Sequence, residues 1–110
     1  MSRFTIRYYF EYMAVTCLWG ADDVTREQFG VNVNPEDLPL SEQTKDDIRA
    51  LSVHWQESLD WDAPAEPSPW SEEDFAMFFK DSESLFQQIR AELDDEFELI
   101  NVMRNFYKPV

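Results

Sequence analysis

Hydrophobic and polar side chains alternate regularly at the beginning of the chain. Over residues 3–12, one face carries large apolar or aromatic side chains, namely Phe4, Ile6, Tyr8, Phe10 and Tyr12. The other face carries Arg3, Thr5, Arg7, Tyr9 and Glu11. Because successive side chains of a strand point to opposite faces, this period of two predicts a β-strand. A second apolar run over residues 15–19 predicts another strand, and Met13-Ala14 between the two runs predicts a hairpin.

Two segments in the middle of the chain have the features of helices. Residues 22–29 begin at Asp22 or Asp23, which can cap a helix, and end before Gly30, which can adopt a left-handed terminating conformation. A second helix is expected to begin after Ser41 and to place one apolar stripe on the core: Ile48, Leu51, Trp55 and Leu59. Residues 31–40 and the proline-rich residues 60–70 are expected to be loops.

The clearest local signal lies at the start of a third helix, predicted over residues 72–93. Ser71 is suited to the N-cap, and Asp74 stands three residues later, as in a capping box. Trp70 and Phe75 occupy the two positions of a hydrophobic staple. Apolar residues then continue at helical spacing to Leu93, with Ser82 interrupting the stripe.

The last apolar segment, residues 97–103, predicts a third strand, and in the tail beyond it Phe106 and Tyr107 could pack back. The element order is therefore β-β-α-α-α-β. We expect one two-layer α+β domain over residues 1–110, with a mostly antiparallel three-stranded sheet and its two main helices on one face. An alternative extends the sheet through a fourth edge strand near Val31–Val33.

The net charge says more about the binding partner than the rest of the composition does. The chain has 23 acidic and 9 basic residues, and its net charge is −14. The acidic residues concentrate between residues 22 and 74 and spare the first strand. Such a field repels nucleic acids and anionic membranes and attracts basic proteins. The alternative is that the acidity serves solubility alone. No segment has the length of a transmembrane span or the pattern of a signal peptide, which predicts a cytoplasmic protein.

Candidate chemistry is sparse. The chain has one cysteine, Cys17, and one histidine, His54, which cannot build a zinc site. Cys17 lies in an apolar run and is expected to be a buried core residue. His54 is expected to be structural, because no local motif ties it to a nucleophile. We therefore expect no catalytic residues, no metal and no cofactor. A small enzyme that uses Cys17 and His54 remains as a third hypothesis.

The segment from Trp55 to Trp70 is the one that suggests binding. It places tryptophans among carboxylates on a loop stiffened by prolines, and such aromatic anchors with acidic neighbours suit the recognition of a basic surface. Trp55 and Trp70 are expected to face the core, whereas Trp61 is more open. The predicted partner-binding residues are Asp60, Trp61, Asp62, Glu66, Glu72 and Glu73.

Several short signatures of the chain resemble a group of small uncharacterised bacterial proteins: Cys17-Leu18-Trp19-Gly20, Leu38-Pro39-Leu40-Ser41, Ser58-Leu59-Asp60-Trp61-Asp62, Pro67-Ser68-Pro69-Trp70-Ser71-Glu72-Glu73 and Phe97-Glu98-Leu99-Ile100. In size and acidity the chain also resembles the immunity proteins of contact-dependent inhibition and other polymorphic toxin systems. That resemblance implies a protein that binds a cognate basic toxin domain, such as a nuclease, and masks its active site. No functional residue is transferred by either resemblance.

A second hypothesis is a nucleic-acid mimic that inhibits a DNA-binding enzyme, because carboxylates spread along a face can imitate phosphates. Both leading hypotheses make the chain a binding protein rather than an enzyme. Its partner is then a basic protein, with no binding to nucleic acid or membrane.

Overall fold

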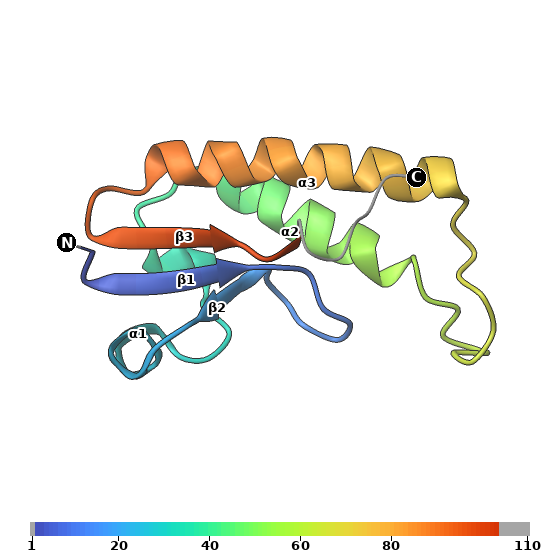
Figure 1. Cartoon of the computed structure of the whole chain (residues 1–110), viewed down its shortest axis with the longest axis horizontal. Coiled ribbons are helices and arrows are strands. Elements are labelled where there is room, and N and C mark those ends of the chain that lie inside the picture. The colour runs from blue at the N-terminus through green and yellow to red at the C-terminus, as the bar shows by residue number, and fades with distance from the viewer. Residues whose placement is uncertain (1, 104–110) are drawn as a thin grey trace.

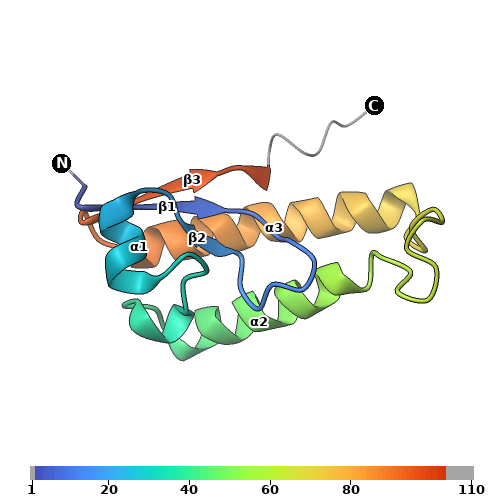
Figure 2. The ribbon, with the colours of Figure 1, turned by 90° about the horizontal axis from the view of Figure 1, so that it is seen from below.

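The computed structural model describes residues 2–103. Its elements are β1 (Phe4–Tyr8), β2 (Leu18–Gly20), α1 (Asp23–Phe29), the 3₁₀ helix η1 (Pro35–Asp37), α2 (Glu42–Gln56), α3 (Glu72–Glu92) and β3 (Phe97–Asn101). Helices α2 and α3 form one layer against a small sheet, and α1 lies beside β2 (Figure 1, Figure 2). The α+β class, the two layers and the order β-β-α-α-α-β are therefore confirmed. The prediction for Phe106 and Tyr107 lies outside the described residues.

The sheet is mixed, so the expectation of a mostly antiparallel sheet is wrong. The strand order is β2-β1-β3. β1 and β2 are antiparallel over three residue pairs, whereas β1 and β3 are parallel from Phe4↔Phe97 to Tyr8↔Asn101. The direction of α3 explains this result, because it carries the chain back to the end of the sheet where β1 begins (Figure 1). β3 therefore starts beside Phe4 and runs in the same direction as β1.

The first two strands are shorter than predicted. Their antiparallel hairpin pairing is confirmed, but the connection spans residues 9–17 rather than Met13-Ala14 alone. β1 stops at Tyr8, and the Phe10 N–H faces the Met103 Sδ at 3.3 Å instead of joining a strand. β2 begins only at Leu18, and just before it the Thr16 hydroxyl donates to the Val33 carbonyl at 2.9 Å. The alternative fourth strand is reduced to a single bridge, Trp19↔Asn32, after which the chain turns into η1.

The helix ends follow from local hydrogen bonds. At α3 the capping box is confirmed: the Asp74 N–H donates to the Ser71 Oγ at 3.1 Å, and the Ser71 N–H donates to the Asp74 carboxylate at 2.9 Å. α2 ends at Gln56 rather than near Leu59. Its last carbonyls are taken by side chains, because the Ser58 hydroxyl donates to Trp55 O at 2.7 Å and the Trp61 indole N–H donates to Gln56 O at 2.7 Å.

The core lies between the sheet and the α2–α3 layer. The predicted inner face of β1 is buried, and Ile6 and Tyr8 are completely inaccessible. They contact the apolar stripe of α3, which includes Phe78, Phe86 and Ile89. Ser82, which interrupts that stripe in the sequence, is also buried. Its carbonyl accepts a hydrogen bond of 2.8 Å from the Tyr8 hydroxyl, so the serine satisfies a buried polar group of β1.

Candidate functional site

The described residues contain neither a cluster suited to a metal ion nor a helix suited to a membrane. Across residues 2–103, no group of three or more His, Cys, Asp and Glu side chains is arranged to hold a metal ion. Over the same range, none of the helices has the length and apolarity needed to cross a bilayer.

Cys17 and His54 lie in different environments. Cys17 is completely buried in the core, and burial raises the pKa of its thiol, so the reactive thiolate is disfavoured. His54 lies on the surface of α2, where its Nδ1 is 3.2 Å from a Glu57 carboxylate oxygen and its ring packs against Trp70. A buried thiol and a surface imidazole of this kind do not form a nucleophile and base.

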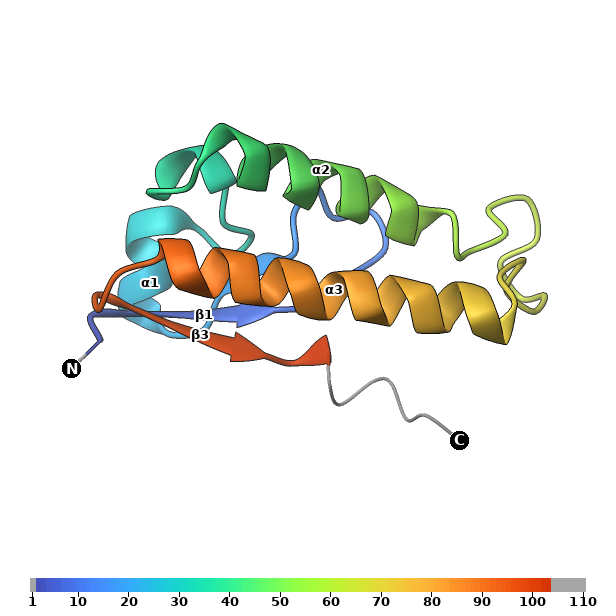
Figure 3. The same ribbon diagram turned by 90° about the horizontal axis from the view of Figure 1, so that it is seen from above.

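The residues predicted to bind a partner lie together at one end of the molecule. Residues 57–74 connect α2 to α3 and enter the first turn of α3; we call this end the acidic tip. It projects beyond the sheet, at the end of the helix layer away from α1 (Figure 1, Figure 3). It carries seven carboxylates, and the chain has no Lys or Arg between Arg49 and Lys80. The seven are Glu57, Asp60, Asp62, Glu66, Glu72, Glu73 and Asp74.

Acidic residues near the other end of α2 are neutralised instead. The Lys45 Nζ lies 3.3 Å from Glu36 and 3.1 Å from Glu42, and its side chain is only 11% exposed. The hydrogen bond with Glu42, followed by that with Glu36, raises the pKa of Lys45. Arg49 pairs with Glu36 and with Asp46, both at 2.7 Å. At the tip, by contrast, the one ion pair within the described residues joins Glu57 to His54, which is charged only when protonated.

The three tryptophans of this segment differ in burial as expected. Trp55 and Trp70 are partly buried against the core, with their rings 5.1 Å and 5.4 Å from that of Phe78. Trp55 also stacks on Tyr12 at 5.4 Å. Trp61 is 48% exposed, and its indole N–H is held by Gln56 O. The Trp61 ring is therefore fixed in place while about half of its surface stays available for contact.

The carboxylates at the tip are not equivalent. Asp62, Glu66, Glu72 and Glu73 are exposed. The Asp60 side chain accepts hydrogen bonds from the N–H groups of Asp62 at 3.1 Å and Ala63 at 3.2 Å, so it also stabilises the loop. The predicted set leaves out two of the seven carboxylates, Glu57 and Asp74, although the absence of Lys and Arg over residues 50–79 is a signal that includes both.

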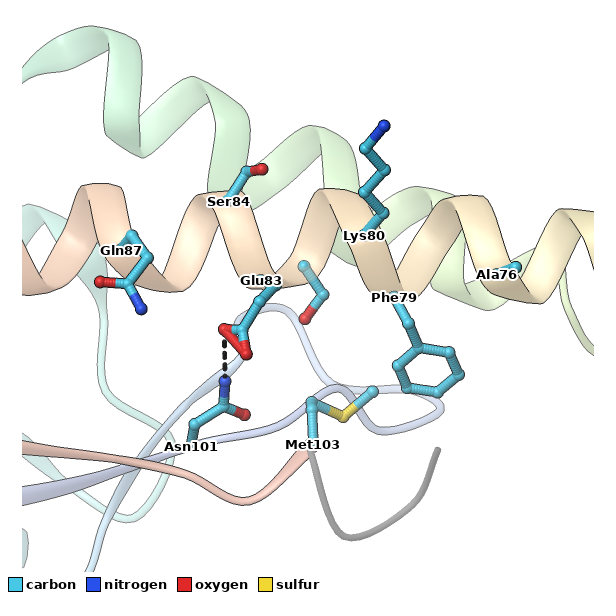
Figure 4. Close-up of a pocket in the computed structure, with 9 residues that line it drawn as sticks. Ala76, Phe79, Lys80, Glu83, Ser84, Gln87, Asn101 and Met103 are labelled. Atoms are coloured by element: carbon cyan, nitrogen blue, oxygen red, sulfur yellow. Dashed lines mark hydrogen bonds between the residues drawn. The ribbon is translucent and has the colours of Figure 1, made fainter. Parts of the chain in front are cut away.

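A second feature was not predicted. A cavity of about 500 Å³ lies between the flank of α3 and the end of β3 (Figure 4). Phe79 and Met103 form its apolar side, and a hydrogen bond of 3.2 Å from the Asn101 amide to the Glu83 carboxylate lies across it. These residues come from segments far apart in the sequence, so no local pattern indicates the cavity.

Comparison with known proteins identifies the family. No curated protein matches the chain. The family described as Serratia CdiI immunity protein-like matches residues 5–103, a range that includes all of the helices and strands except the first residue of β1. Immunity proteins of this kind belong to contact-dependent growth inhibition, and they are non-enzymatic inhibitors of a cognate CdiA toxin. The match spans most of the chain, so this protein belongs to the Serratia CdiI immunity protein-like family.

Proposed function

We propose that this chain neutralises a basic cognate toxin domain, such as a nuclease, by covering its active site with the acidic tip. The observation that carries the proposal is the set of seven carboxylates at one end of the fold, with no Lys or Arg from residue 50 to residue 79. A site that binds phosphate groups is lined by cations, and those cations attract a concentrated negative field. We expect the protein to act in the cytoplasm.

The roles of the tip residues follow from their exposure. Trp61 supplies an apolar contact at low entropic cost, because its indole N–H is already held by Gln56 O. Asp62, Glu66, Glu72 and Glu73 are exposed and can pair with Lys or Arg of the toxin. Asp60 orders the loop through its two hydrogen bonds and so positions Trp61 and Asp62.

Binding of the cognate CdiA toxin domain to charge-matched variants tests this proposal. Glu72→Gln/Glu73→Gln removes two carboxylates from the tip, and Glu27→Gln/Asp37→Asn removes two exposed carboxylates elsewhere. We expect the tip variant to raise the Kd by about ten-fold or more and to reduce the dependence of binding on salt. The control pair should change the Kd by less than about three-fold. Equal losses from both pairs would mean that the tip is not the contact surface.

The nucleic-acid mimic makes a different prediction. A mimic should compete with DNA for several unrelated DNA-binding enzymes, whereas an immunity protein should protect cells against one toxin only. Growth protection against the cognate toxin and against non-cognate toxins, measured beside DNA-competition assays, distinguishes the two functions.

A further inference from the structure

The two edges of the sheet differ in how they are covered. The β2 edge is covered by the residues after α1: the Gly20 N–H donates to Val31 O at 2.9 Å, and the Val33 N–H donates to Leu18 O at 2.8 Å. β3 lies at the other edge and, within residues 2–103, is paired with β1 alone. Among residues 2–103, no segment continues the sheet beyond β3. An uncovered edge strand is a template for pairing with another chain.

The hydrogen bonds of β3 show which main-chain groups face outward. Glu96 O accepts from the Phe4 N–H at 2.8 Å, and the Val102 N–H donates to Tyr8 O at 3.0 Å. Because the groups that face a neighbouring strand alternate along a parallel ladder, residues 98 and 100 also face β1. The N–H and C=O of Leu99 therefore point away from the sheet.

The cavity beside α3 lies next to this edge. Phe79 and Met103 form its apolar side, and Gln87 of α3 lies farther along it (Figure 4). A strand added beside β3 would alternate its side chains between the helix layer and solvent. A side chain that points toward the helix layer would enter this cavity, so the edge and the cavity are suited to the same extended segment.

The charge beside the β3 edge indicates which kind of extended segment can pair with it. Asp94, Asp95, Glu96 and Glu98 are exposed beside the edge, and residues 91–103 contain no Lys or Arg. Lys80 lines the cavity together with Glu83, so carboxylates outnumber cations over the edge and the cavity taken together. A Lys- or Arg-containing segment complements these carboxylates, whereas a second copy of the chain would bring the same carboxylates and a further charge of −14. The cavity also includes Ala76, two residues after Asp74 of the acidic tip, so one partner can contact both surfaces.

We infer that the edge of β3 receives an extended basic segment of the cognate toxin domain as a fourth strand, with one apolar side chain in the cavity beside α3. This inference rests on the proposed function. It adds main-chain pairing, which is insensitive to the partner's exact sequence, to the charge complementarity of the acidic tip.

Amide hydrogen exchange on the complex with the CdiA toxin domain tests the pairing. The Leu99 amide should exchange at least about ten-fold more slowly in the complex, because its outward N–H gains an acceptor. The Glu42 amide in the first turn of α2 has no intrahelical acceptor and should change by less than about two-fold. Tight binding with an unchanged Leu99 amide would overturn the inference and leave the proposed function standing. No binding at all would overturn both.

Two matched substitutions test the cavity. Gln87→Trp places a large ring in the cavity, whereas Gln28→Trp places the same ring on α1, beside the opposite edge of the sheet. Both residues are exposed, so both variants should keep the wild-type melting temperature. Gln87→Trp should weaken toxin binding by about ten-fold or more, and Gln28→Trp should leave it unchanged. Wild-type affinity of folded Gln87→Trp would show that no side chain of the toxin enters the cavity.

Discussion

The carboxylate of Glu92, at the end of α3, accepts a hydrogen bond of 2.6 Å from the main-chain N–H of Ser41, at the start of α2. The other oxygen of the same carboxylate accepts from the hydroxyls of Ser41 at 3.2 Å and of Thr44. Ser41 is the N-cap of α2, so the negative charge lies at the positive end of that helix. This contact joins the two helices at the end of the layer opposite to the acidic tip.

The Glu92 carboxylate should therefore contribute stability that depends on pH in a defined way. The hydrogen bond from the Ser41 N–H, followed by that from the Thr44 hydroxyl, lowers the pKa of Glu92 from its ordinary value of 4.5. The stabilisation is complete above that value and is lost as the pH falls through the lower folded-state pKa. We expect Glu92→Gln to cost about 1–2 kcal/mol near neutral pH.

Urea unfolding of the wild type and of Glu92→Gln at several pH values measures this effect. The difference in the free energy of unfolding should shrink below pH 4.5. Glu27→Gln, an exposed substitution on α1, controls for the change in net charge. A difference that stays constant down to about pH 3 would contradict the role of the ionised carboxylate.

The hydroxyl of Tyr8 should contribute to stability because it is buried and makes a hydrogen bond to the main chain of α3. It donates to Ser82 O at 2.8 Å, and burial raises the pKa of the phenol. Tyr8→Phe removes this bond, and we expect it to lower the free energy of unfolding by about 1–2 kcal/mol. Tyr9→Phe is the matched control and should cost less than about 0.5 kcal/mol, since the ring stack of Tyr9 on Trp19 is retained. Equal costs would show that the bond to Ser82 adds nothing.

Gly20 is required by a close approach of the backbone. A Cβ at this position would lie 2.8 Å from Gly30 O and 3.0 Å from the Arg26 Cγ. The carbonyl belongs to the main chain and cannot move without shifting the end of α1. We expect Gly20→Ala to lower stability by about 1–3 kcal/mol, measured as a lower melting temperature. A wild-type melting temperature would show that α1 is free to move away from β2.

The thiol of Cys17 should be inert in the folded protein. It is completely buried, and burial raises its pKa, so both access and ionisation are suppressed. Labelling by a thiol reagent near pH 8 should be at least about 100-fold slower than in denaturant. Rapid labelling under native conditions would place the thiol at the surface. Cys17→Ala should keep full immunity function, because family members are not enzymes.

Substitutions of Trp55 and Trp61 should affect different properties: Trp55→Ala should lower stability, and Trp61→Ala should weaken toxin binding. Trp55→Ala removes a ring packed between Tyr12 and Phe78, and we expect a loss of about 3 kcal/mol in the free energy of unfolding. Trp61 is 48% exposed, and Trp61→Ala should cost less than about 1 kcal/mol. Trp61→Ala should nevertheless weaken toxin binding by about ten-fold. Normal affinity of Trp61→Ala would exclude Trp61 as a binding anchor.

The sequence alone was sufficient for features that depend on neighbouring residues. The capping box of Ser71 and Asp74 involves residues three apart, and the inner face of β1 follows from the alternation of side chains. The acidic tip was also partly predictable, because the absence of Lys and Arg over thirty residues, 50–79, is a property of the sequence. These features need no knowledge of where the distant parts of the chain lie.

Only the tertiary structure decided the features that join distant segments. Side chains alternate in the same way along parallel and antiparallel strands, so the pattern at Phe97–Asn101 could not reveal that β3 runs parallel to β1. The end of α2 depended on which side chains reached its last carbonyls. The cap at the start of α2 depended on Glu92, which lies fifty-one residues after Ser41 in the sequence and is brought beside it by folding. A sequence pattern records the preferences of each segment, whereas long-range hydrogen bonds depend on which polar groups folding brings together.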